Sequence, residues 1–133
     1  MRQGRIILAD KHSNMLEGVR RLLEDEVDTV LMVADEISLN HALENFSPDV
    51  VVVDLSLPIS KGTNIAWMLK KNFPKIRVIV LSIHDEKSAV DDVMAAGVEG
   101  FVLKRRAVID LIPAIREVLQ GHKYISSDVN GAS

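Results

Sequence analysis

Val50-Val51-Val52-Val53-Asp54-Leu55-Ser56-Leu57-Pro58 is the stretch of sequence that predicts the fold. Four consecutive valines are typical of a strand covered on both faces, because a half-exposed strand would alternate apolar and polar residues. Asp54 ends this run, so its carboxylate is expected where the buried strand emerges, which in an open α/β sheet is the edge that binds ligands. Pro58 stops the strand and Gly62 permits a tight turn. We therefore expect Asp54 to be exposed and rigidly held.

The rest of the chain alternates apolar strands with amphipathic helices. Strands are predicted over residues 6–9, 29–34, 50–53, 78–81 and 101–103, and each is followed by a pattern of helical spacing. Short connections between alternating elements predict a single doubly wound five-stranded parallel sheet with five helices, an α/β fold. The residues from Lys123 onward turn small and polar, so 123–133 are expected to form a loose tail.

Helix ends are predicted from capping residues and breakers. Asn14 with Glu17 has the spacing of a capping box, and Ser38 is a candidate cap for the second helix. The fourth helix is expected from about Glu86 to Gly97. The fifth is expected from about Asp110, with Pro113 tolerated in its first turn.

Composition limits the classes of function. The 133 residues are 47% hydrophobic, which suffices for one core, and the absence of cysteine excludes disulfides and thiolate metal sites. A net charge of -3 argues against direct binding of nucleic acid, which needs a concentrated basic face. No apolar run approaches about 18 residues. A soluble, cytoplasmic domain without a membrane partner is expected.

Polar residues stand where the predicted strands end. Asp10 and Lys11 follow the first strand, Asp54 the third, Ser82 the fourth and Lys104 the fifth. Because parallel strands all point one way, these side chains should converge on one edge of the sheet. There is no glycine-rich dinucleotide turn and no Walker loop, so the edge offers no phosphate-cradling backbone of those kinds. A small flavodoxin-like or hydrolytic enzyme is therefore disfavoured.

The order of these residues resembles the receiver domain of two-component response regulators, over nearly the whole chain. Asp54, Pro58 and Gly62 are similar to the phospho-acceptor strand and its loop, Ser82 to the conserved hydroxyl, and Lys104 to the invariant lysine. Two phrases, Ala9-Asp10-Lys11-His12 and Gly121-His122-Lys123-Tyr124-Ile125-Ser126, most resemble the subfamily with a LuxR/NarL-type DNA-binding domain. The resemblance implies the sheet order 2-1-3-4-5.

The resemblance also implies roles for individual residues. Asp54 would accept a phosphoryl group from a sensor histidine kinase or a histidine phosphotransfer protein, assisted by Lys104 and Ser82. Mg²⁺ would be held by Asp10, Asp54 and the backbone carbonyl of Ser56. Ser82 and Phe101 would form the switch that relays the signal. The domain would be residues 1–121, and residues 122–133 would be a tail or the start of a linker to an output domain absent here, through which alone DNA would be contacted. A homodimer is compatible with this reading.

Lys11 departs from the family pattern, which places a second acid after Asp10. Asp10, Asp54 and Lys104 together carry a formal charge of -1, or zero if Lys11 also points inward. A contact-distance pair of charges is worth about 4 kcal/mol at an effective dielectric near 20, so magnesium binding should be weakened or lost. Lys11 either pairs with Asp54 or extends into solvent. The alternative function is a pseudo-receiver, a phosphorylation-independent binding or dimerisation module.

Overall fold

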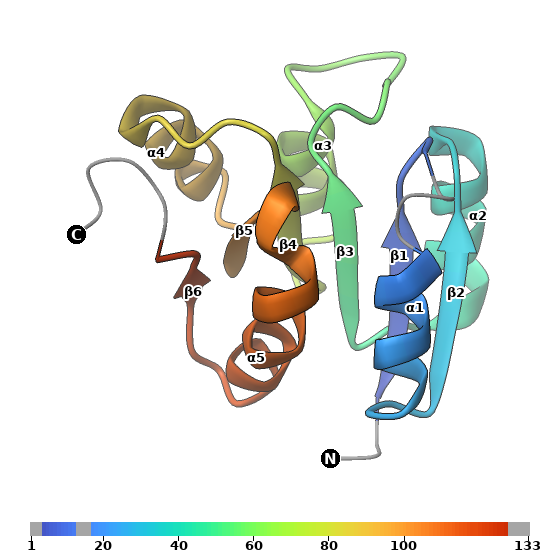
Figure 1. Ribbon diagram of the computed structural model, residues 1–133. Coiled ribbons are helices and arrows are strands. Elements are labelled where there is room, and N and C mark those ends of the chain that lie inside the picture. Colours follow the sequence, from blue (N-terminus) through green and yellow to red (C-terminus); the bar gives the residue numbers. More distant parts are fainter. Residues whose placement is uncertain (1–3, 13–16, 128–133) are drawn as a thin grey trace.

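The computed structural model describes residues 4–12 and 17–127 and shows a parallel sheet between two layers of helices (Figure 1). In this part of the chain the sheet has six strands in the order β2-β1-β3-β4-β5-β6, with every neighbouring pair parallel. The strands are β1 (Arg5–Ala9), β2 (Thr29–Val33), β3 (Val50–Asp54), β4 (Arg77–Ser82), β5 (Gly100–Leu103) and β6 (Tyr124–Ile125).

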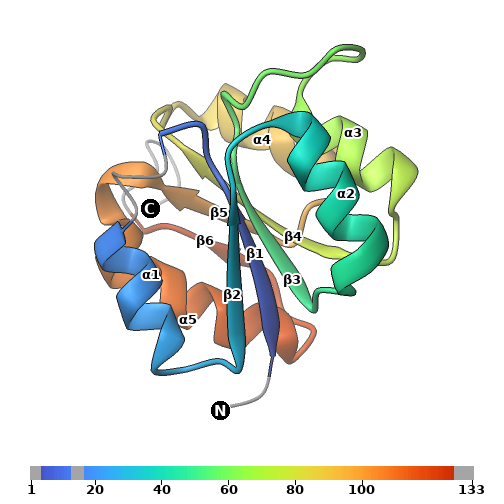
Figure 2. The ribbon, with the colours of Figure 1, turned by 90° about the vertical axis from the view of Figure 1, so that its right-hand side faces the viewer.

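Helices cover both faces of the sheet, which Figure 2 shows edge-on. The helices of the described residues are α1 (Glu17–Glu24), α2 (Glu36–Phe46), α3 (Ile65–Asn72), α4 (Lys87–Ala95) and α5 (Ala107–Leu119), with a 3-10 turn, η2 (Lys104–Arg106), between β5 and α5. α1 and α5 pack on one face, and α2, α3 and α4 on the other. No helix of the described residues has the length and apolar character needed to cross a membrane.

The valine strand is the centre of this architecture. All four valines of β3 are inaccessible to solvent; Val51 and Val53 point into the core under α2, α3 and α4, whereas Val50 and Val52 point toward α1 and α5. Burying an aliphatic side chain of this size stabilises the fold by about 1.5 kcal/mol. The prediction of a strand covered on both faces is confirmed, and the burial of β3 holds Asp54 at the carboxyl edge.

The five-stranded prediction is wrong by one strand, although the order 2-1-3-4-5 is confirmed for the first five. Tyr124 and Ile125, expected in a loose tail, add β6 to the free edge of β5. The Tyr124 amide donates to the Glu99 carbonyl at 3.1 Å, and the Ser126 amide donates to the Phe101 carbonyl at 2.9 Å. The strand was missed because two residues carry no recognisable alternation, and its partners lie 24 residues earlier in the chain.

Two helix starts also differ from the predictions. α2 begins earlier than expected, because the Asp35 carboxylate caps it by accepting from the Ser38 amide at 2.7 Å, so Ser38 is not the cap. α5 begins at Ala107 rather than near Asp110, which places Pro113 in the helix interior instead of the first turn. Pro113 and Ile109, whose carbonyl loses its helical partner, are both exposed, so water can satisfy that carbonyl. Asn14 of the predicted capping box lies outside the described residues.

Candidate active site

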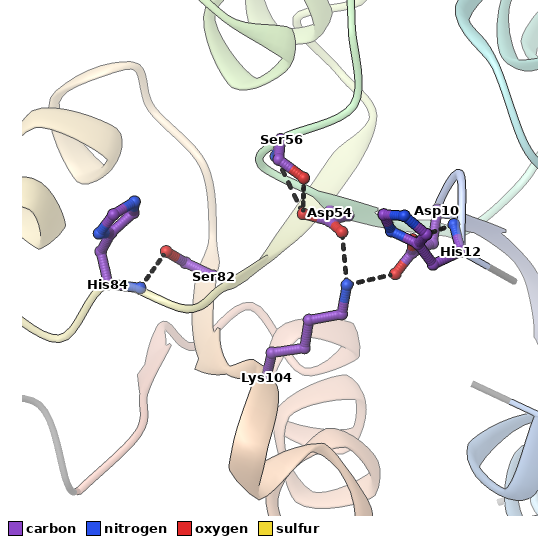
Figure 3. Close-up of polar contacts among 7 residues, drawn as sticks. All are labelled: Asp10, His12, Asp54, Ser56, Ser82, His84 and Lys104. Atoms are coloured by element: carbon purple, nitrogen blue, oxygen red, sulfur yellow. Dashed lines mark hydrogen bonds and ion pairs between the residues drawn. The ribbon is translucent and has the colours of Figure 1, made fainter. Parts of the chain in front are cut away.

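The carboxyl edge of the sheet brings together the acids and the lysine that the sequence placed at separate strand ends (Figure 3). Lys104 follows β5, Asp54 ends β3 and Asp10 follows β1. The Lys104 ammonium lies 2.6 Å from Asp54 Oδ2 and 2.9 Å from Asp10 Oδ2. The contact with Asp54 is a hydrogen bond, whereas the contact with Asp10 is an ion pair without hydrogen-bond geometry. The predicted convergence of these three residues is confirmed.

The three charged side chains are nearly removed from solvent. The side chain of Asp10 is 0% exposed, that of Asp54 6% and that of Lys104 13%. The expectation that Asp54 is exposed is therefore wrong, because the lysine and the loop after β3 cover it. Two carboxylates and one ammonium leave the cluster with a formal charge of -1. Because of this net negative charge, the site is suited to binding a cation, or a group that binds together with a cation.

The other oxygen of Asp54 is held by its own loop. Ser56 donates to Asp54 Oδ1 from both its backbone amide and its hydroxyl, each at 2.9 Å. Burial alone would raise the pKa of Asp54, but the hydrogen bonds from Lys104 and Ser56 together hold that pKa below its ordinary value. The carboxylate is therefore ionised and fixed in orientation, as a nucleophile at this position requires.

Lys104 is charged in the same arrangement. Burial disfavours the ammonium form, yet the hydrogen bond with Asp54 and the negative charges of Asp54 and Asp10 raise the pKa of Lys104 above its ordinary value. A charged lysine between two carboxylates is a preformed cation that can follow an oxygen added to either of them.

Ser82 reaches the same edge but does not contact Asp54 among the described hydrogen bonds. Its hydroxyl instead accepts the backbone amide of His84 at 3.0 Å (Figure 3). Phe101, three residues before Lys104, is fully buried in the core under α4. The serine hydroxyl would have to leave the His84 amide before it could bond a group on Asp54.

Lys11 does not point into the site. The residue is exposed, and within the described residues it forms no ion pair, so the proposed pairing with Asp54 is not found. The neighbouring His12 contributes its backbone amide, which donates to Asp10 Oδ1 at 2.7 Å, while its ring is largely exposed. The charge of the buried cluster is thus set by Asp10, Asp54 and Lys104 alone.

The donor set fits a hard cation with few protein ligands. In the part of the chain described, no three His, Cys, Asp or Glu side chains are grouped closely enough to hold a metal ion. Mg²⁺, however, is usually bound by one or two carboxylates together with phosphate oxygens and water. Asp10 Oδ2 is buried without a hydrogen bond and meets only the Lys104 ammonium, at 2.9 Å, so a metal ion would share this oxygen with Lys104 or displace it. Asp10 and Asp54 supply the one or two carboxylates by which Mg²⁺ is usually bound.

A second polar cluster adjoins the turn that follows β5, and the sequence analysis missed it. Asp110 of α5 is buried and accepts from Ser126, Tyr124 and Arg106. The four-residue spacing of Arg106 and Asp110 was the available sequence signal, since such pairs face each other on a helix. The contribution of Tyr124 and Ser126 depends on β6, which was not predicted.

Comparison with known proteins agrees with this site. Residues 6–116 match the family model of the response regulator receiver domain. The transcriptional regulatory protein DegU of Brevibacillus brevis is 35% identical over 126 residues, covering 93% of this chain and 53% of that protein. The chain thus spans about half the length of the curated relatives it matches.

Comparison with solved structures also indicates a receiver domain. The isolated receiver domain of RcsB from Salmonella enterica serovar Typhimurium, with the phosphomimetic BeF₃⁻, is 30% identical with a TM-score of 0.85, covering 96% of each chain. RcsB from the same organism bound to the promoter P1flhDC is 30% identical with a TM-score of 0.83, covering 96% of this chain and 64% of that chain. With Asp54 and Lys104 joined at the carboxyl edge of the sheet, the chain belongs to the response regulator receiver domains, and it is most like those of LuxR/NarL-type regulators.

Proposed function

We propose that Asp54 accepts a phosphoryl group from the phosphohistidine of a sensor histidine kinase or histidine phosphotransfer protein. The observation that carries this proposal is the Lys104 ammonium 2.6 Å from the Asp54 carboxylate, at the end of a fully buried strand. A receiver is a signalling domain rather than a conventional enzyme. Any catalysis by this chain is limited to its own phosphorylation and dephosphorylation.

The transfer needs little chemistry beyond positioning. The Asp54 carboxylate attacks phosphorus, an oxygen–phosphorus bond forms, the nitrogen–phosphorus bond breaks, and its electron pair returns to the imidazole. Lys104 stabilises the charge on the equatorial oxygens as a point charge. Ser56 donates two hydrogen bonds to Asp54 Oδ1, and the other carboxylate oxygen, Oδ2, faces Lys104.

Asp10, Asp54 and the Ser56 carbonyl are the groups that would hold Mg²⁺, and the bound ion would neutralise charge between the carboxylates and the phosphoryl oxygens. Lys104 now neutralises part of the same charge, because it contacts both acids. Lys11 stands where the family has another acid and adds positive charge beside the site. We therefore expect weaker binding of the ion than in receivers with the acidic pair.

Relay to an output is the second part of the proposal. After phosphorylation, the Ser82 hydroxyl would exchange the His84 amide for a phosphoryl oxygen, which shifts a pre-existing equilibrium. RcsB, a structural relative, has been solved on a promoter. Residues 1–121, together with the strand β6, would be the receiver, and the rest of 122–133 would be a tail or the start of a linker to an output domain that contacts DNA. A homodimer of receivers fits the same scheme.

The test is a phosphorylation assay read by intact mass. The protein is incubated with Mg²⁺ and a small phosphodonor such as acetyl phosphate, and one phosphoryl adduct is expected on the wild type. Asp54→Asn is the matched control and should give none. Wild-type protein that stays unmodified, with a receiver of the same subfamily modified in parallel, would refute phosphoryl transfer.

A pseudo-receiver is the second candidate, and one observation favours it. Lys104 already bridges both acids without a metal, and Lys11 replaces a metal-binding acid. The protein would then act as a binding or dimerisation module without phosphorylation. An adduct on Lys11→Asp but none on wild type would support this candidate.

A further inference from the structure

The strand β6 is too short to be stable through backbone pairing alone. It pairs Tyr124 with Gly100 and Ile125 with Phe101. A short edge strand held by a few hydrogen bonds is marginal in water, since ordering each residue costs about 1–2 kcal/mol. Side-chain contacts must therefore supply part of what holds this segment on β5.

A buried carboxylate supplies those contacts. Asp110 is 4% exposed and accepts from the Ser126 hydroxyl at 2.7 Å and the Tyr124 hydroxyl at 3.0 Å. The Ser126 hydroxyl in turn accepts the Leu103 amide at 3.0 Å. Burial opposes the charge of Asp110, but the hydrogen bonds from Arg106, Ser126 and Tyr124 keep its pKa below the ordinary value. An ionised acid thus anchors β6 to the end of β5.

The basic turn η2 connects this anchor to the phosphorylation site. Lys104, its first residue, pairs with Asp54 and Asp10, and Arg106, its last residue, pairs with Asp110 at 3.0 Å. Leu103, whose amide is held by Ser126, directly precedes Lys104. One three-residue turn is therefore tied to the acidic site at one end and to the β6 anchor at the other.

Backbone contacts provide a route that the buried switch residue does not. Phe101 is fully buried, so its ring offers no exposed surface to an output element. Its carbonyl, however, accepts the Ser126 amide at 2.9 Å. Movement of the end of β5 would reach the chain after Ile125 through Leu103, Phe101 and Ser126.

We propose that residues 124–126 form a latch, defined as β6 plus Ser126, which Asp110 holds on β5 and which reports the position of Lys104. When Lys104 leaves its two acids, the turn loses one of its two anchors, and the latch loosens. The use of this latch in signalling rests on the proposed function, because a phosphoryl group on Asp54 is what would draw Lys104 away. The latch and its link to Lys104 do not depend on phosphorylation.

The test measures hydrogen exchange of single amides by NMR, in the full chain and without a phosphodonor. Ser126→Ala removes the hydroxyl that joins Asp110 to Leu103, and Asp110→Asn removes the anchoring charge. Each substitution should speed exchange of the amides of position 126 and Leu103 by about tenfold or more. This factor corresponds to the stability lost when a buried hydrogen bond to a charged group is removed. Ile125→Val, at the exposed neighbouring position, is the control. Rates in both variants within about twofold of this control would overturn the latch.

The link to the acidic site is tested in the same way. Lys104→Met should speed exchange of the Ser126 amide by about fivefold, whereas Arg105→Met, in the same turn but paired at the surface with Asp85, should not. Equal rates in Lys104→Met and wild type would overturn the link. Unchanged protection of the Val52 amide in the sheet centre shows that each variant is folded. A missing phosphoryl adduct on Asp54 would refute the proposed function alone, because these exchange rates need no phosphodonor.

Discussion

Replacing Lys104 by methionine isolates the electrostatic contribution of the buried cluster. Methionine keeps most of the apolar stem of lysine and removes the charge. The change leaves Asp10 and Asp54 as two buried carboxylates, and the formal charge of the site goes from -1 to -2. The ammonium now lies 2.6 Å and 2.9 Å from their oxygens. Both acids therefore lose their close cationic partner at once.

The size of the effect follows from burial. Because the three side chains are at most 13% exposed, solvent screens the pairs only weakly. Removing one member of such a buried pair costs about 3–5 kcal/mol. We expect a loss of about 3 kcal/mol in the free energy of unfolding at pH 7, since the acids at this edge can recover some water. A domain with a stability of about 5–15 kcal/mol remains folded after that loss.

The assay is equilibrium unfolding in urea, with the slope m compared between variants. Lys75→Met, at an exposed position, is the control and should change little. Adding Asp54→Asn to Lys104→Met should restore part of the loss, because it removes one uncompensated charge, with a coupling energy of about 2 kcal/mol. A loss below about 1 kcal/mol at constant m, or strict additivity in the double variant, would refute the reasoning.

Two further predictions concern other parts of the fold. Asp110, whose pKa is held below its ordinary value of about 3.9, contributes stability that is complete above that value and is lost as pH falls through the lower folded value. The midpoint temperature of thermal unfolding should therefore fall less steeply with acidification below about pH 4 in Asp110→Asn than in the wild type. Parallel plots of this midpoint against pH for the two proteins would contradict the prediction. Gly100→Ala should cost about 1–3 kcal/mol in urea unfolding, because its Cβ would lie 2.9 Å from Ile79 Cγ1. Gly18→Ala, with nothing within 4 Å, should not destabilise, and equal losses in both would count against the packing argument.

Much of the site could be predicted because local sequence patterns indicate the direction and the burial of the strands. The valine run of β3 needs two covered faces, and parallel strands end at one edge, so Asp10, Asp54 and Lys104 had to meet there. Ser82 was placed at the correct edge for the same reason. Its hydrogen bond to the His84 amide was not predicted, because it depends on how the loop after β4 folds.

The burial of Asp54 and the outward position of Lys11 were beyond local patterns. Asp54 is covered because Lys104, fifty residues later, lies against it, and Ser56 turns back onto it. Lys11 stays in solvent where Lys104 already occupies the space between the acids. Which of the two lysines lies in the cluster depends on contacts between residues distant in sequence, so the local sequence around either lysine does not predict it.

Residue patterns alone were enough for the α/β class, for the existence of the first five strands and for the acids and lysine at one edge, because hydrophobic periodicity and strand polarity are short-range properties of the chain. The order of those strands across the sheet came from the family resemblance. Assembly in three dimensions was needed for β6, for the Asp110 cluster that holds it and for the charge balance around Asp54. Those features arise from hydrogen bonds and ion pairs between segments at least 14 residues apart, whose free energy exists only once the sheet has brought the segments together.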